Sequence, residues 1–172
     1  ALTENDAITE IYMGPNINKI YNETFQGLPS LKKIVVSAEN EKFCDINGVL
    51  YNKDKTILLK FPQKNETKIF EIPTTLKECE LYAIEKAENV EAIKMPAKYT
   101  GSNIDIYNLK PESFPNLKTI AVPEGNSYYL SDAGVLYNPD KTILYWYPSN
   151  KPSIDFTIPN SVKTIAKGAF VN

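Results

Sequence analysis

The stretch GVLYNKDKTIL at residues 48–58 returns as GVLYNPDKTIL at residues 134–144, with a single substitution. A shift of 86 residues aligns Leu31–Ile84 with Leu117–Phe170 without a gap, and about 21 of 54 positions are identical. Self-similarity at a fixed spacing indicates a repeat architecture, in which each unit buries its apolar face against its neighbours. The chain is therefore expected to form one elongated domain over residues 1–172, or a fragment of a longer array.

A shorter motif lies inside the long repeat, a hydrophobic-x-hydrophobic triplet that is often followed by Pro. In a strand, the first and third residues of such a triplet face the interior and the middle one faces outward. The Pro cannot donate a ladder hydrogen bond, so it ends the strand. The triplets occupy residues 11–13, 34–36, 70–72, 93–95, 120–122 and 156–158. They predict a solenoid of about six coils, with units at 8–30, 31–67, 68–89, 90–116, 117–153 and 154–172.

The two long units carry an insertion that reads as a β-hairpin. Asn and Asp favour the tight turn, and the flanks are rich in β-branched and aromatic residues. The second strand of each hairpin is predicted to point Leu59 and Phe61, or Tyr145 and Tyr147, inward, which leaves Lys60 and Trp146 outward. Apolar residues outside these strands are expected to fill the convex side, namely Ile17, Ile20, Phe25, Val162, Ile165 and Phe170.

Composition excludes several functional classes. The chain has 172 residues, no His, 19 positive charges that are all Lys, and 21 acidic residues. Without His there is no Ser-His-Asp triad, Cys-His dyad or His-ligated zinc, and without Arg there is no bidentate fork for phosphate. With a net charge of −2, the chain has no electrostatic attraction to nucleic acid. No segment has the length of a membrane span, and no cofactor or metal is expected.

The strands, the hairpins and the segment Ser161–Phe170, which follows the pattern S-V-x-x-I-x-x-x-A-F, together resemble the BspA-like leucine-rich repeat family of bacterial surface proteins. The segment Ala97–Lys110 departs from the pattern. The resemblance implies a mainly β leucine-rich-repeat solenoid with an irregular or short helical convex side. It also implies a non-catalytic module, secreted or at the cell surface, that binds a host, bacterial or extracellular-matrix protein. The alternatives are a glycan-binding module and a structural spacer; uncapped ends predict end-to-end self-association or truncation.

Two sets of residues are candidates for a binding surface. The hairpin aromatics supply one, because exposed aromatic rings contribute binding energy to protein and sugar partners alike. In this set, Tyr129 and Tyr147 replace Phe43 and Phe61 and are assigned to the core. The remaining aromatic candidates are Tyr128, Tyr145 and Trp146. The second set is the outward stripe of the strands, made of Tyr12, Val35, Glu71, Lys94, Ala121 and Thr157.

Other reactive residues have structural explanations. Cys44 and Cys79 correspond to Leu130 and Ile165, which favours buried thiols over a disulfide or a reactive site. Glu78 and Glu80 become Thr164 and Ala166 in the second copy, and acidic pairs such as Glu85 and Glu88 arise readily on solvated faces, which argues against a glycosidase site. A turn role accounts for Asp54 and Asp140 without calcium. Glycosylation patterns occur at residues 22–24 and 65–67.

Overall fold

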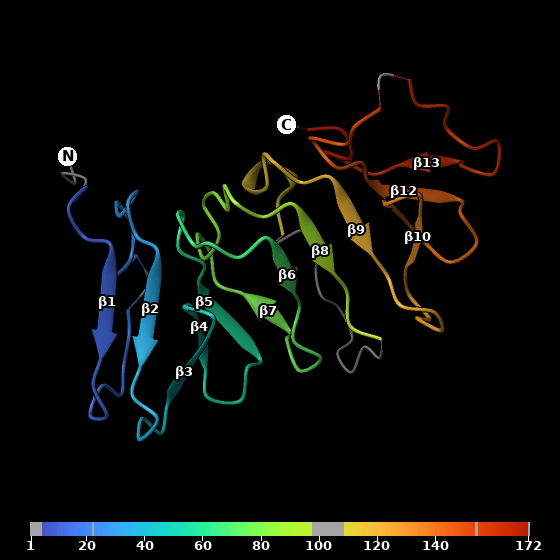
Figure 1. Ribbon diagram of the computed structural model, residues 1–172. Coiled ribbons are helices and arrows are strands. Elements are labelled where there is room, and N and C mark those ends of the chain that lie inside the picture. Colours follow the sequence, from blue (N-terminus) through green and yellow to red (C-terminus); the bar gives the residue numbers. More distant parts are fainter. Residues whose placement is uncertain (1–4, 22, 98–108, 154, 172) are drawn as a thin grey trace.

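The computed structural model describes residues 5–21, 23–97, 109–153 and 155–171 and shows a β-solenoid of about six turns (Figure 1). Within these ranges, helix is limited to the 3-10 turn η2 (Pro111–Ser113). The expected solenoid is therefore confirmed. Most of the atypical segment Ala97–Lys110 lies outside the described residues, so the prediction that this coil is irregular stays a prediction.

Five of the six hydrophobic-x-hydrophobic triplets form short parallel strands. Strand β1 (Glu10–Met13) pairs with β2 (Lys33–Val36), and β6 (Ile69–Glu71), β8 (Ala92–Lys94) and β9 (Thr119–Ala121) form a second sheet. Their inward residues are buried as the alternation predicts, with Ile34, Ile93 and Ile120 each at most 1% exposed. The outward residues therefore lie in register on the opposite side of each strand.

Each insertion interrupts this row of parallel strands. The amide of Ile34 donates to the Gly48 carbonyl at 2.9 Å, and the amide of Ile120 donates to the Gly134 carbonyl at 3.0 Å. The hairpin corner, the turn at Gly48 or Gly134 between the first two strands of each insertion, thus lies beside β2 or β9. It takes the position where the next parallel strand would pair. The predicted strand at residues 156–158 does not form, which corrects the sequence analysis for that coil.

The insertions are confirmed as hairpins and are larger than expected. In the first copy, β3 (Phe43–Ile46), β4 (Val49–Asn52) and β5 (Ile57–Lys60) are antiparallel, and β7 (Glu78–Cys79) joins β5 in parallel. The second copy repeats this with β10 (Leu130–Asp132), β11 (Val135–Tyr137), β12 (Ile143–Trp146) and β13 (Thr164–Ile165). Asn52 closes the turn, because its Oδ1 accepts from the amides of Thr56 and Ile57, each at 2.8 Å. In the second copy, Asp140 Oδ1 accepts from the Thr142 hydroxyl at 2.8 Å, which supports its turn role.

A bulge reverses the predicted orientation at the end of β5 and β12. Tyr51 pairs with Leu58 but Leu50 pairs with Lys60, so one residue is extra on β5. A β-bulge turns the following side chains to the other face. Lys60 and Trp146 are consequently buried, at 3% and 2% exposure, and their predicted outward orientation is wrong.

The other assignments in these strands hold in part. Phe61 is buried, whereas Leu59 and Tyr145 are half-buried because the bulge moves them off the inward face. Tyr147 is also half-buried and packs its ring on Phe156 and Phe170, with centroids 4.7 and 5.3 Å away.

The convex side is filled best in the middle of the solenoid. There Leu76, Cys79 and Ile84 are buried, while Ile20, Phe25 and Val162 are half-buried. The expectation was wrong for Ile17, Ile165 and Phe170, which are 44%, 49% and 45% exposed. These residues lie on the first and last coils of the described structure, where a coil packs on one neighbour only.

Candidate binding surface

The outward stripe of the parallel strands divides into two groups. Tyr12, which is 71% exposed, lies opposite the half-buried Val35 on β1 and β2. Glu71, Lys94 and Ala121 are exposed and lie in one row across β6, β8 and β9. Thr157 is exposed as predicted, but on a segment without strand pairing. The turn at Gly48 between β3 and β4 separates the two groups. Tyr12 and Val35 therefore lie together, and Glu71, Lys94 and Ala121 form a separate row.

Ion pairs between neighbouring coils cover much of this face. Glu10 accepts from the Tyr12 hydroxyl at 2.5 Å and pairs with Lys33 Nζ at 3.1 Å. These contacts lower the pKa of the Glu10 carboxyl, and the hydrogen bond with Tyr12 has the largest effect. Farther along, Lys94 pairs with Glu71 at 3.0 Å, and the charges balance in both places. Such exposed ion pairs contribute little to stability. The face is a mixed polar surface, and Tyr12 is its largest apolar side chain.

Of the aromatic candidates, only Tyr128 is well exposed. It is 52% exposed at the start of the second insertion. Tyr145 is half-buried, and its ring meets Tyr129 edge-on at 5.8 Å. Trp146 packs against Phe114 at 5.6 Å, and its Nε1–H has no hydrogen-bond partner among the described residues. Trp146 is therefore a core residue, and it is removed from the candidate surface.

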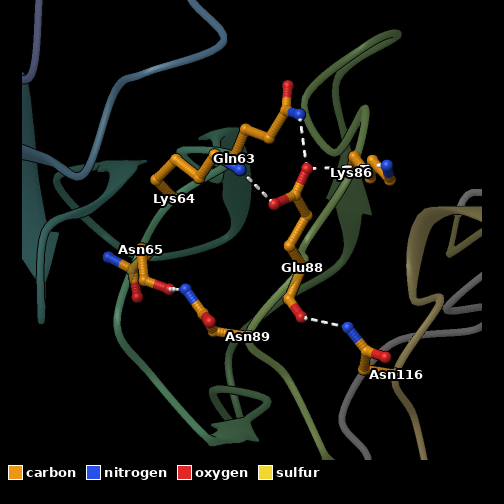
Figure 2. Close-up of polar contacts among 7 residues, drawn as sticks. All are labelled: Gln63, Lys64, Asn65, Lys86, Glu88, Asn89 and Asn116. Atoms are coloured by element: carbon orange, nitrogen blue, oxygen red, sulfur yellow. Dashed lines mark hydrogen bonds and ion pairs between the residues drawn. The ribbon is translucent and has the colours of Figure 1, made fainter.

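A polar network that the sequence analysis did not identify joins successive coils just before their strands (Figure 2). Asn65 Nδ2 donates to the carbonyls of Lys32 and Asn47 at 3.1 and 2.8 Å. Asn89 Nδ2 donates to the Asn65 carbonyl at 3.0 Å, and Asn116 Nδ2 donates to the Glu88 carbonyl at 2.7 Å. These side chains satisfy backbone carbonyls of the neighbouring coils, and the recurrence of Asn ahead of the strands was the available signal.

Glu88 lies at the centre of the same network. Its carboxylate accepts from Lys64 Nζ and from Gln63 Nε2, the latter at 2.8 Å, and it pairs with Lys86 Nζ at 3.5 Å (Figure 2). These contacts lower the pKa of the Glu88 carboxyl to about 2, and the hydrogen bond with Lys64 has the largest effect. Glu88 is therefore an anionic link between coils, which explains one member of the carboxylate pair at Glu85 and Glu88.

The other member, Glu85, pairs with a buried lysine. Lys60 Nζ lies 3.4 Å from Glu85 Oε1, and the side chains are 4% and 35% exposed. Burial lowers the pKa of the Lys60 amine, and Glu85 opposes that shift. The ion pair keeps the ammonium compensated at the rim of the core, as a buried charge requires.

The remaining reactive residues are held in the fold. Cys44 and Cys79 are not joined in a disulfide; Cys79 is buried, as predicted, and burial raises its pKa to about 12. Cys44 is half-buried, and its Sγ lies 3.3 Å from the Asn52 carbonyl. In the glycosylation pattern at residues 65–67, Asn65 is 3% exposed, and its amide nitrogen donates a hydrogen bond to the Asn47 carbonyl. The side chain is therefore inaccessible to glycosylation in the folded protein. Asn22 of the other pattern lies outside the described residues.

In the described part of the chain, no helix has the length and apolar character to cross a bilayer. In the same part, no three His, Cys, Asp or Glu side chains converge in a way that could hold a metal ion.

Known proteins share this architecture. Residues 1–57 match the family model described as "BspA type Leucine rich repeat region (6 copies)". The pneumococcal vaccine antigen PcpA has a similar structure, with a TM-score of 0.56 and 18% identity over 92% of this chain and 35% of that chain. A leucine rich cell surface protein from Faecalibacterium prausnitzii A2-165 has a TM-score of 0.53 and 19% identity over 95% of this chain and 39% of that one. No curated protein sequence matches the chain.

These matches complete the assignment of the fold. At such identities, the structural similarity shows the architecture alone, and the chain spans about two fifths or less of the length of both neighbours. Residues 1–57 thus carry a BspA-type leucine-rich repeat region, and the later coils of the described chain continue the same solenoid architecture.

Proposed function

We propose that the chain is a non-catalytic binding module, secreted or displayed on a bacterial surface, that contacts a protein partner through its sheet face. The observation that carries this proposal is the row of outward side chains on β1, β2, β6, β8 and β9. In a repeat fold, inward positions are constrained by packing, whereas outward positions are free to be set by a partner. The leucine rich cell surface protein with the same architecture supports the location.

The sheet face suits a broad protein interface. Its exposed groups are an aromatic ring, carboxylates and ammonium groups spread over five strands, with no concentration of one charge. Aromatic anchors surrounded by polar groups are typical of protein interfaces. Tyr12 is the expected anchor, because it is the most exposed large apolar side chain of the described residues.

Binding of the purified chain to an array of extracellular-matrix proteins and glycans tests this proposal. The variant Tyr12→Ala changes the sheet face, and Tyr128→Ala changes an aromatic residue of equal size on the hairpin. Saturable protein binding that is weakened about tenfold by Tyr12→Ala supports the proposal. Binding weakened only by Tyr128→Ala would assign the hairpin instead, and a purely glycan signal would assign the sugar-binding alternative.

Two controls belong with the array. Light scattering on the same samples reports self-association, which exposed Ile165 and Phe170 on the last described coil would favour. A blank array with a monomeric mass would contradict the binding role and support a structural spacer. The fluorescence of Trp146 reports on folding and not on surface contact, because that ring is in the core.

A further inference from the structure

A hollow opens on the convex side of the first hairpin unit. It is lined by residues 20–21 and 23–26 of the first coil, by Leu59 and Lys60 at the end of β5, and by residues 80–82. A neighbouring hollow shares residues 80–82 and continues to Lys110 and Ser113. The hollow shares no lining residue with the outward stripe of the sheet face, so a role for it is independent of the sheet-face interface.

The second copy of the repeat carries a larger side chain at the position of Lys60. Lys60 corresponds to Trp146, whose ring lies on Phe114 with a centroid distance of 5.6 Å. Phe114 and Leu109 on that coil are 0% and 1% exposed. Their counterparts in the first copy are Leu28, which is half-buried, and Glu23, which is exposed. An indole thus covers the coil in one copy, and a thin aliphatic chain leaves it partly open in the other.

The ion pair of the buried Lys60 ammonium group is also specific to the first copy. Its Nζ is held by Glu85, whose counterpart is Val171. The first copy therefore replaces a Trp and a Val by an ion pair at the back of the hollow. Glu85 compensates the charge of the Lys60 ammonium group, but the lysine side chain fills less volume than the indole of Trp146.

The rim of the hollow differs between the copies in a second way. Leu81 and Tyr82 are 66% and 50% exposed, whereas their counterparts are Lys167 and Gly168. Tyr82 has φ 66°, in the left-handed region that Gly168 occupies with φ 76°. A bulky residue at such a φ is strained and persists where it has a role. The copy that lacks the indole is thus the one that exposes two apolar side chains beside the gap.

We propose that this hollow is a binding site for an aromatic side chain, preferably an indole, presented by a partner protein. Its apolar walls are Ile20, Phe25 and Leu59, and Tyr21 and Tyr82 stand at the rim. Glu23 and Glu80 also line it, and Lys19 Nζ lies 4.5 Å from the centroid of the Tyr21 ring, so that two carboxylates and one ammonium group remain at the rim once Lys60 is paired with Glu85. An aromatic residue followed by a basic one in the partner matches this chemistry, because the ring enters the hollow and the cation meets the carboxylates and the Tyr82 ring.

Fluorine NMR with N-acetyl-5-fluorotryptophanamide as the probe tests the site. The wild-type chain is expected to broaden and shift the fluorine signal saturably, with a dissociation constant in the millimolar range. Lys60→Trp carries the residue of the second copy and is expected to weaken binding about tenfold by filling the hollow. Amide shifts of Ile20, Leu59 and Tyr82 in labelled protein would place the probe.

A surface variant keeps the test decisive if Lys60→Trp does not fold. Leu81→Lys carries the residue of the second copy at an exposed position and is expected to weaken binding several-fold. Ile158→Lys makes the same kind of change on the last described coil and should leave binding unaltered. The proposal is overturned if the probe shows no saturable response or if neither Lys60→Trp nor Leu81→Lys alters it. Tighter binding of a methyl glycoside at the same residues would also overturn it, in favour of a sugar site.

Discussion

Replacing Gly48 by Ala tests whether the hairpin corner takes the place of a strand beside β2. A Cβ built on Gly48 would lie 2.5 Å from Lys33 Cβ and 3.0 Å from Lys33 Cα, and the backbone there has φ +80°. Lys33 Cβ and Cα are fixed to the strand, so no side-chain rotation relieves the contact. The corner must move, and the hydrogen bond from the Ile34 amide to the Gly48 carbonyl weakens.

The expected cost combines three effects. A side chain in the left-handed region costs about 1 kcal/mol, the weakened hydrogen bond about 1 kcal/mol, and the displaced strand about 1 kcal/mol more. Gly48→Ala is therefore expected to lower the free energy of unfolding by about 3 kcal/mol, which corresponds to about 6 to 12 °C in Tm for a chain of this size.

Two other glycines serve as controls. Gly125 has φ +82° with nothing within 4 Å of the added Cβ, so Gly125→Ala should lose only the conformational part, about 1 kcal/mol. Gly14 has open space and no positive φ, so Gly14→Ala should be near neutral. Urea unfolding followed by circular dichroism measures all three variants. Equal losses for Gly48→Ala and Gly125→Ala would refute the close approach of the hairpin corner to β2.

Three further outcomes are expected. Trp146→Ala should cost about 3 to 5 kcal/mol, measured by urea unfolding, and iodide should barely quench the native Trp146 fluorescence; strong quenching would contradict its burial. Asn65→Ala should cost about 2 to 4 kcal/mol in the same assay, because the carbonyls of Lys32 and Asn47 lose their donor, whereas a neutral effect would show that water replaces it. Glu88→Gln should cost about 1 kcal/mol at pH 7; because the folded pKa is lowered to about 2, this contribution is present above the unfolded value near 4.5 and lost as pH falls through 2. Stability curves of wild type and Glu88→Gln that fail to converge at low pH would oppose that assignment.

The periodicity of the chain predicted most of the backbone. Alternating triplets located β1, β2, β6, β8 and β9, because one face of each strand is buried and the other is exposed. The repeated Asn and Asp of the insertions located both hairpin turns through local side-chain to backbone bonds. The predicted strand at residues 156–158 failed because a triplet needs a paired neighbour to become a strand.

The candidate surface was predictable only in part. Outward positions such as Tyr12 and Lys94 followed from alternation, and both are exposed. Trp146 could not be placed in this way, because the bulge between β11 and β12 depends on the pairing of two strands and not on the composition of either. The hollow beside Lys60 was also missed, since it exists only where residues 20–21 and 23–26, β5 and residues 80–82 meet.

By itself, the sequence determined the repeat, the alternation of buried and exposed strand residues, and the hairpin turns. These features depend on neighbours within a few residues, where side-chain chemistry acts directly on the backbone. The tertiary structure decided the inward turn of Lys60 and Trp146, the pairing of Lys60 with Glu85, and the division of the sheet face at the hairpin corner. Those outcomes depend on how coils stack, because a shift of one residue in strand pairing exchanges the inside and the outside of the solenoid.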